Sequence, residues 1–249
     1  MAMDLLLGVD LAAKPERTFA AMGSVADDGR LRITELQNPV SDEQLVASSR
    51  AAHRIIAIDA PFGWPYEFAS FVATYHEGRT PREVTRLEFR FRETDKFIHD
   101  TLGKWPLSVS TDKLGVVAHR AVSLLLKFRD CDIPPFWQNG RSTTVIEVYP
   151  AATLIALGIT PGRYKREAPD RRQILAELKS LGLDIPTDLA GRCVESHDAL
   201  DAVICAWAAH LYLQGDTLGP EALSPRRDDI VAREGWIYVP KPRRSSALP

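Results

Sequence analysis

The first sixty residues contain short apolar or β-branched runs, and one segment of alternating polar and apolar residues, that are typical of β-strands. The Asp-Asp-Gly sequence at residues 27–29 is a strong turn signal between two of these segments and indicates a hairpin. Ser41 and Gln44 have the spacing of a capping box, which predicts a helix that extends to about residue 53. The predicted strands cover residues 5–11, 18–25, 30–36 and 54–59.

The pattern changes after Pro61, where convincing strands disappear and helical periodicity begins. We expect residues 62–141 to form a mainly helical insertion, with helices over residues 81–102 and 111–128. The segment STTVIEVY at residues 142–149 predicts another strand. Further predicted helices cover residues 151–157, 168–181 and 197–213.

This element order predicts an α/β fold, a mixed five-strand sheet with helices on both faces. We expect a single domain over residues 1–240, followed by a mobile basic tail at residues 241–249. The length of 249 residues, with 45% hydrophobic and 26% charged residues, is ordinary for such a globular domain.

Charge and cysteine content narrow the possible classes of protein. The formal net charge of −2 and the pI near 6.3 lack the basic balance that is typical of nucleic-acid binders, although local basic patches remain possible. Cys131, Cys193 and Cys205 offer neither a disulfide framework nor a C-x-x-C zinc motif. No segment is long and apolar enough to span a membrane, so we expect a cytoplasmic protein without membrane contact.

Several carboxylates interrupt segments that are otherwise expected to be buried. Asp10, Asp59 and Glu147 lie in predicted strands, and Asp201 lies in the last predicted helix, three residues after Asp198. An ionised carboxylate in a low-dielectric interior costs several kcal/mol unless it is paired, hydrogen-bonded or bound to a metal. We therefore expect these acids to share a cation, and an all-oxygen ligand set favours Mg²⁺ or Mn²⁺.

Most of these acids also have a simpler interpretation. The alternatives are an exposed edge strand for Asp10, a turn cap for Asp59, an ion pair with Arg90 or Arg92 for Glu147, and the helix dipole for Asp198. Asp10, Glu147 and Asp201 leave the fewest such explanations, and they form the core of the predicted site. Asp59 and Asp198 are expected additions.

Five motifs in this order resemble the domain-of-unknown-function 429 family: GVDLA, IDAPFGWP, FRETD, EVYPAATL and HDALDAVICAW. The final helix is also similar to the ending of Holliday-junction resolvase-type nucleases, which have a ribonuclease H-like fold. The resemblance covers roughly residues 5–240. It implies a ribonuclease H-like sheet in which Asp10 is the first metal ligand, Asp59 lies beside it, and the protein is a nuclease that could act as a homodimer.

Two cations match positions of the family pattern and are candidates for substrate binding. Lys165 lies in GRYKREAPDRR at residues 162–172, which carries five cations and two acids and could hold a phosphate backbone or form a solvated face. Arg92 of FRETD could clamp a phosphate, with Asp95 as an orienting group or further ligand. The alternative for FRETD is an intrahelical ion-pair lattice with Glu88 and Lys96.

Other residues have weaker functional interpretations. His197 adjoins the acidic helix face and could assist proton transfer, although a histidine at a helix start is more often incidental. Aromatic rings in the insertion could stack nucleobases, but they more often form the core of such a region. These rings belong to Trp64, Phe91, Trp105 and Trp137.

The predicted function is hydrolysis of phosphodiester bonds in DNA or RNA by two metal ions held by carboxylates. One rival is an actin- or sugar-kinase-like phosphotransferase, but Asp10 is followed by Leu11, Ala12 and Ala13 rather than by glycines that approach phosphate. The other rival is a ribonuclease H-like module that binds or regulates without cutting, which the near-neutral charge favours.

Overall fold

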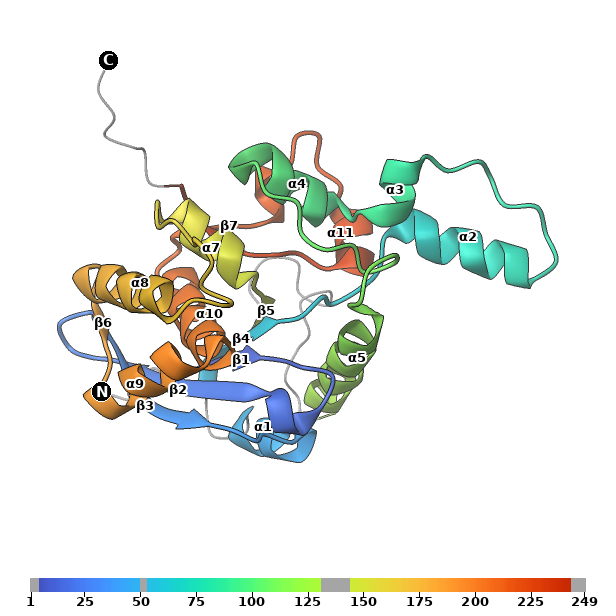
Figure 1. Cartoon of the computed structure of the whole chain (residues 1–249). Helices are drawn as coiled ribbons and strands as arrows, with labels where there is room; N and C mark the ends of the chain where they lie inside the picture. Colours follow the sequence, from blue (N-terminus) through green and yellow to red (C-terminus); the bar gives the residue numbers. More distant parts are fainter. Residues whose placement is uncertain (1–4, 50–52, 131–143, 243–249) are drawn as a thin grey trace, which may run out of the picture.

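The computed structural model describes residues 5–49, 53–130 and 144–242 of the chain, and a six-stranded β-sheet lies at its centre (Figure 1). The strands are β1 (Leu5–Asp10), β2 (Phe19–Val25), β3 (Leu31–Gln37), β4 (His53–Asp59), β5 (Val145–Glu147) and β6 (Leu183–Asp184). Their order across the sheet is β5-β4-β1-β2-β3-β6. β2 is antiparallel to both of its neighbours, whereas β4 is parallel to β1, β5 to β4 and β6 to β3.

The predicted mixed α/β architecture is confirmed, but the predicted number of strands in the sheet is wrong by one. The additional strand, β6, has only two residues and follows the left-handed Gly182. Two residues are too few to show the alternation that identifies a strand in a sequence. β6 forms because β3 offers an open edge, so its pairing depends on tertiary structure.

The helices agree with the predicted pattern in most places. They are α1 (Asp42–Ser49), α2 (Tyr66–His76), α3 (Arg86–Arg90), α4 (Glu93–Leu102), α5 (Gly115–Arg129), α7 (Pro150–Ala156), α8 (Ala168–Ser180), α9 (Thr187–Glu195), α10 (His197–Leu213) and α11 (Asp228–Glu234). Short 3-10 turns occur at Pro15–Arg17 and Pro220–Ala222, and a second small sheet pairs β7 (Thr217–Leu218) with β8 (Val239–Pro240).

Local capping chemistry explains two of the helix starts. The Ser41 and Gln44 side chains each bond the other residue's backbone N–H, as the capping box predicts. Ser196 accepts a hydrogen bond from the Ala199 N–H and caps α10. The helix predicted over residues 81–102 is instead two helices, because Phe91 and Arg92 adopt extended backbone between α3 and α4.

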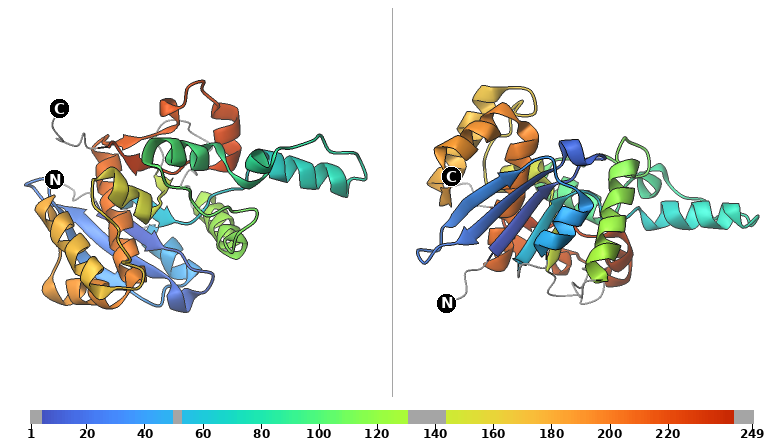
Figure 2. Two further views of the ribbon diagram at one scale, coloured as in Figure 1. Left: turned by 45° about the horizontal axis from the view of Figure 1, so that its top comes forward. Right: turned by 90° about the horizontal axis from the view of Figure 1, so that it is seen from below.

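Helices cover both faces of the sheet, with α10 on one face and α1 and α5 on the other (Figure 2). The α10 face buries Leu6 and Ala57 against alanines of that helix, whereas the opposite face buries Leu7 and Ile56 against α5. Successive strand residues point to opposite faces. Even-numbered β1 residues and odd-numbered β4 residues therefore point towards α10.

Gly8 allows α10 to approach β1 very closely. A Cβ atom at this position would lie 2.2 Å from both the Ala202 carbonyl oxygen and the Ala206 nitrogen. Only a residue without a side chain fits that space. The close approach brings the polar first turns of α10 next to the carboxyl end of β1, where Asp10 lies.

The described residues between β4 and β5 form four helices, α2 to α5, and contain no strand. α2 extends away from the body of the molecule and buries none of its residues (Figure 1). Trp137, considered above for base stacking, lies outside the described residues, as does most of the expected basic tail. Within the part of the chain that is described, every helix is too short or too polar to cross a lipid bilayer.

Candidate metal centre

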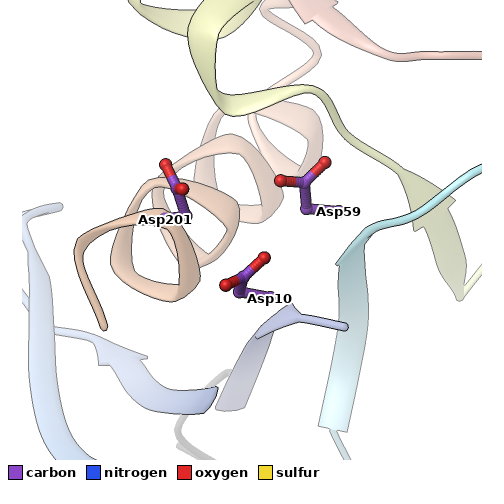
Figure 3. A group of neighbouring side chains, drawn as sticks. All are labelled: Asp10, Asp59 and Asp201. Atoms are coloured by element: carbon purple, nitrogen blue, oxygen red, sulfur yellow. The ribbon is translucent and has the colours of Figure 1, made fainter. Parts of the chain in front are cut away.

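Three aspartates from separate elements point towards one another at the end of the sheet (Figure 3). Asp10 and Asp59 are register partners at the carboxyl ends of the parallel strands β1 and β4. Asp201 lies on the second turn of α10, the helix that Gly8 admits. One carboxylate oxygen from each residue lies within 4.8 Å of the other two.

Among the described residues, the side chains of Asp10 and Asp59 form no hydrogen bond and no ion pair within 4 Å, although the charge of Lys165 acts on both. Burial, followed by the negative charge of Asp59, raises the pKa of Asp10 well above its usual value. Burial and the charge of Asp201 raise the pKa of Asp59 to about 8. The charge of Lys165 offsets only part of this effect, so two partly buried acids that repel each other leave the site favourable for a further positive group.

Asp201 is fully buried and has partners on both oxygens. The Tyr164 hydroxyl donates to its Oδ1 over 2.9 Å, and the Lys165 ammonium forms an ion pair with its Oδ2. Burial acts to lower the pKa of Lys165, but the charges of Asp201 and Asp59 outweigh it and raise the pKa above its usual value. Lys165 is therefore a charged group, and its side chain is half exposed beside the three carboxylates.

The residues present fit a divalent cation of the Mg²⁺ or Mn²⁺ class. All three groups are carboxylates, the hard oxygen ligands that these ions prefer. One oxygen from each aspartate lies within 4.8 Å of the other two, so the three carboxylates together would hold one such ion. The raised pKa values of Asp10 and Asp59 show how much a positive charge would relieve this site.

Asp198 lies one turn before Asp201 but outside this group of three. His197 Nε2 lies 2.8 Å from one of its oxygens, and Arg17 Nη2 lies 3.3 Å from the other. Burial acts to raise the pKa of Asp198, but the hydrogen bond and charge of His197, with help from Arg17, lower it below its usual value. Asp198 therefore has its own partners, His197 and Arg17, at the rim of the site.

Glu147 occupies a different position from the one expected. It pairs in register with Ile58 rather than with Asp59, so its side chain points to the face of the sheet opposite Asp59. There it receives two hydrogen bonds from Arg92, of 2.9 and 2.7 Å, and one of 3.0 Å from the Phe62 N–H. The ion pair with an insertion arginine, considered as the alternative, is the observed arrangement, and Glu147 does not join the three aspartates.

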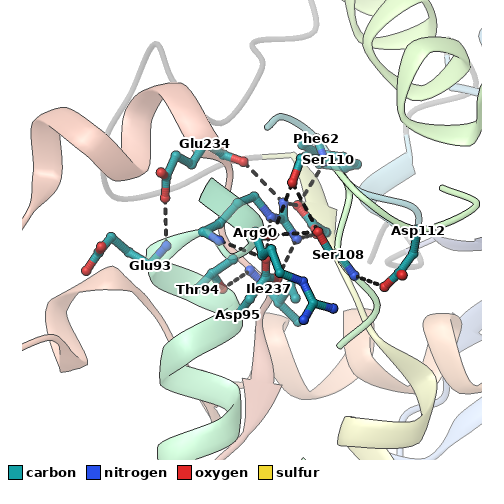
Figure 4. Close-up of polar contacts among 12 residues, drawn as sticks. Phe62, Arg90, Glu93, Thr94, Asp95, Ser108, Ser110, Asp112, Glu234 and Ile237 are labelled. Atoms are coloured by element: carbon teal, nitrogen blue, oxygen red, sulfur yellow. Dashed lines mark hydrogen bonds and ion pairs between the residues drawn. The ribbon is translucent and has the colours of Figure 1, made fainter. Parts of the chain in front are cut away.

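Arg92 is likewise an internal structural group rather than a free phosphate clamp. Its guanidinium is 2% exposed and bonds Asp95, Glu147 and the Glu234 carbonyl oxygen. The neighbouring Thr94 hydroxyl accepts from the Ile237 N–H over 2.8 Å (Figure 4). FRETD thus joins α4 to β5 and to the C-terminal segment. Lys96 forms its ion pair with Glu93, whereas Asp95 pairs with Arg92.

A pocket of about 510 Å³ adjoins the carboxylates. Asp10 and Asp59 line it together with Lys165, and the exposed cations Lys104, Arg163 and Arg166 also contribute. The Trp105 ring stacks 4.0 Å from His99 and lies 4.2 Å from Phe91. Trp105 and Phe91 therefore pack against other residues of the insertion, which is the simpler of the two interpretations of these aromatic residues.

The sequence interpretation missed two residues that build this site. Gly8 sets the distance between β1 and α10, and Tyr164 orients Asp201. Gly8 could have been found from its position two residues before Asp10, together with the small residues Ala202 and Ala206 spaced by one helical turn. Tyr164 carries no comparable signal, because its contact joins positions 37 residues apart.

A family model described as "Protein of unknown function (DUF429)" matches residues 8–223. Comparison with curated proteins and with solved structures gave no match. The matched range includes all three aspartates, Lys165 and Arg92. It ends before Glu234 and Ile237, which anchor the C-terminal segment to Arg92 and Thr94.

Proposed function

Because the chain belongs to the DUF429 family of proteins of unknown function, its activity has to be inferred from its own residues, and we propose a metal-dependent nuclease. This nuclease would hydrolyse phosphodiester bonds of DNA or RNA with bound Mg²⁺ or Mn²⁺. The observation that carries the proposal is the convergence of Asp10, Asp59 and Asp201. Asp10 and Asp59, which form no ion pair within 4 Å among the described residues, are the strongest part of it.

The topology supports assignment to the ribonuclease H-like folds. Within the six-stranded sheet, the order β3-β2-β1-β4-β5 contains an antiparallel β1-β2-β3 meander followed by two strands parallel to β1. α10 then packs on β1 and carries Asp201. Asp10 with Asp59 beside it is the placement that the resemblance implies, whereas Glu147 lies outside the group.

Each residue has a role that follows from its position. The three aspartates would hold the ion, which when bound supplies positive charge at a phosphate oxygen and lowers the pKa of coordinated water. Tyr164 fixes the rotamer of Asp201 through its hydroxyl. Lys165 presents a half-exposed ammonium at the pocket surface, where it would bind a phosphate oxygen of the substrate.

Protons must leave the site when a cation enters it. The pKa of Asp59, about 8, keeps its carboxyl largely protonated at neutral pH, and the pKa of Asp10 is also raised. Carboxylates bind a metal in the ionised form, so metal affinity rises with pH as these groups lose their protons. Activity at a limiting metal concentration should therefore increase from pH 6 to pH 8.

The direct test is cleavage of a panel of DNA and RNA substrates with Mg²⁺ or Mn²⁺. Wild-type protein is compared with Asp10→Asn and Asp201→Asn, and with Asp100→Asn as a matched control on the exposed end of α4. We expect cleavage by the wild type and the control, and at least a hundredfold loss in both site variants. Cleavage that survives both site substitutions would refute the assignment of the centre.

A binding module that does not cut is the second candidate, and one contact favours it. Lys165 already neutralises part of the negative charge of Asp201. The protein itself therefore supplies some of the positive charge that a metal ion would bring. In that case the wild type would bind nucleic acid without cleaving any member of the panel. Asp10→Asn and Asp59→Asn would then leave binding unchanged.

A further inference from the structure

The pocket beside the carboxylates is larger than an ion and a phosphate group require. Its volume of about 510 Å³ falls within the range of sites that enclose whole small ligands. Apolar side chains from two segments make up much of its lining. They are Pro106, Leu107, Leu114 and Val117 between α4 and the first turn of α5, and Ala151 and Ile155 on α7.

Leu107 shows that this apolar lining is open to solvent. Its side chain is 60% exposed, although it is large and apolar and lies beside a strongly charged site. Leu114, Val117 and Ile155 are only partly buried around the same pocket. Neither a metal ion nor a phosphate group gains from such contacts, so the apolar part needs a ligand group with an apolar surface of its own.

Cations make up another part of the lining. Lys165 adjoins the carboxylates, while Arg163, Arg166 and Lys104 are exposed at other positions of the pocket. A ligand that uses all parts of this pocket carries a negatively charged group next to a flat apolar one. A nucleotide has this combination, because its phosphate is joined through a sugar to a base with two apolar faces.

We propose that the pocket takes one unpaired nucleotide of a single strand, with its base against Leu107 and its neighbours and its phosphate between Lys165 and the carboxylates. A base-paired duplex does not fit, because its bases are paired and stacked and cannot enter a pocket of about 510 Å³ one at a time. A base inside a duplex would first have to leave its stack, at a cost of a few kcal/mol. This inference rests on the proposed nuclease function, which it narrows to single-stranded substrates.

The test measures binding, so that it does not depend on catalysis. Fluorescein-labelled oligothymidylate and a blunt-ended DNA hairpin of equal length are titrated with wild-type protein in Ca²⁺ at one fixed salt concentration, and anisotropy is recorded. Fixed salt is needed because the phosphate contacts are salt-dependent. We expect the single strand to bind at least tenfold more tightly than the hairpin.

Two substitutions of an exposed apolar residue by serine distinguish binding in the pocket from a general effect of the protein surface. Leu107→Ser should weaken binding of the single strand at least fivefold, because it removes the exposed apolar contact. Val116→Ser is the matched control, since Val116 is 67% exposed on α5 but does not line the pocket. Both side chains are exposed, so both variants should fold, which thermal melting verifies.

Each outcome separates this inference from the proposed function. Equal affinity for hairpin and single strand, or Leu107→Ser binding like the wild type, would overturn the single-nucleotide pocket even if nucleic acid is cleaved. The expected binding pattern without cleavage of any substrate in Mg²⁺ or Mn²⁺ would support the pocket and refute the nuclease. Absence of measurable binding to either probe would also overturn the inference.

Discussion

Replacing Asp59 by asparagine should stabilise the metal-free protein and, at the same time, remove its response to metal. In the folded protein the pKa of this carboxyl is about 8, compared with an ordinary value of 3.8. Between these two values the folded state binds more protons than the unfolded chain, so the free energy of unfolding falls as pH rises. The wild type in chelator should therefore be less stable at pH 8 than at pH 5.

The size of the effect follows from the pKa difference. pH 7 lies about three units above the ordinary pKa of the carboxyl, and each unit corresponds to about 1.4 kcal/mol. The carboxyl therefore lowers the free energy of unfolding by at most about 4 kcal/mol at this pH. The carboxyl is only partly shielded from water, which reduces the effect. We expect Asp59→Asn to raise the free energy of unfolding by about 1 to 3 kcal/mol at pH 7.

Urea unfolding in chelator at pH 5, 7 and 8 measures this directly, with Asp100→Asn as the control on an exposed carboxylate. Asp59→Asn should be much less sensitive to pH than the wild type, and the control should follow the wild type. Adding Mn²⁺ at pH 8 should stabilise the wild type and the control but not Asp59→Asn. A wild type as stable at pH 8 as at pH 5, or an Asp59→Asn variant no more stable at pH 7, would refute the electrostatic argument.

Three further substitutions test the packing and charges around the site. Gly8→Ala places a methyl group against the backbone of α10 and should lower the free energy of unfolding by about 3 kcal/mol in urea, whereas Gly191→Ala, which meets open space, should cost little or stabilise. Arg92→Met strands the buried Glu147 and Asp95 and should cost about 3 to 5 kcal/mol by the same measurement; a loss below about 1 kcal/mol would contradict the structural role of this arginine. Lys165→Met should lower kcat about 10²-fold at saturating Mn²⁺, with less loss in Lys165→Arg, and an unchanged kcat would exclude a phosphate contact.

The strands were predictable where a local signal was strong. β1 to β4 were found nearly at their observed ends, because alternation and the Asp-Asp-Gly turn are properties of neighbouring residues. α10 was found with its Ser196 cap. β6, α2, α9 and α11 were missed. β6 and the short helices α9 and α11 form only where a neighbouring surface is already in place, and α2 buries none of its residues.

For the acidic residues, too, some positions were predictable from the sequence and others were not. Asp10 and Asp201 of the predicted core lie close together, and Asp59, which was only an expected addition, completes the group at the ends of the parallel strands. Glu147 was placed with them, although its register beside Ile58 turns it to the other face of the sheet. A shift of one residue in register reverses the face to which a side chain points, and register between strands distant in sequence depends on the assembled sheet.

The sequence by itself determined which segments become strands and helices, and which acids interrupt apolar surroundings, because both depend on residues close together in the chain. The tertiary structure decided which acids meet. Gly8 admits α10 and so brings Asp201 to Asp10, while Arg92 neutralises Glu147 on the opposite face. Charge compensation of a buried carboxylate depends on partners that only the folded chain brings within a few ångströms, so the metal centre became definable only in three dimensions.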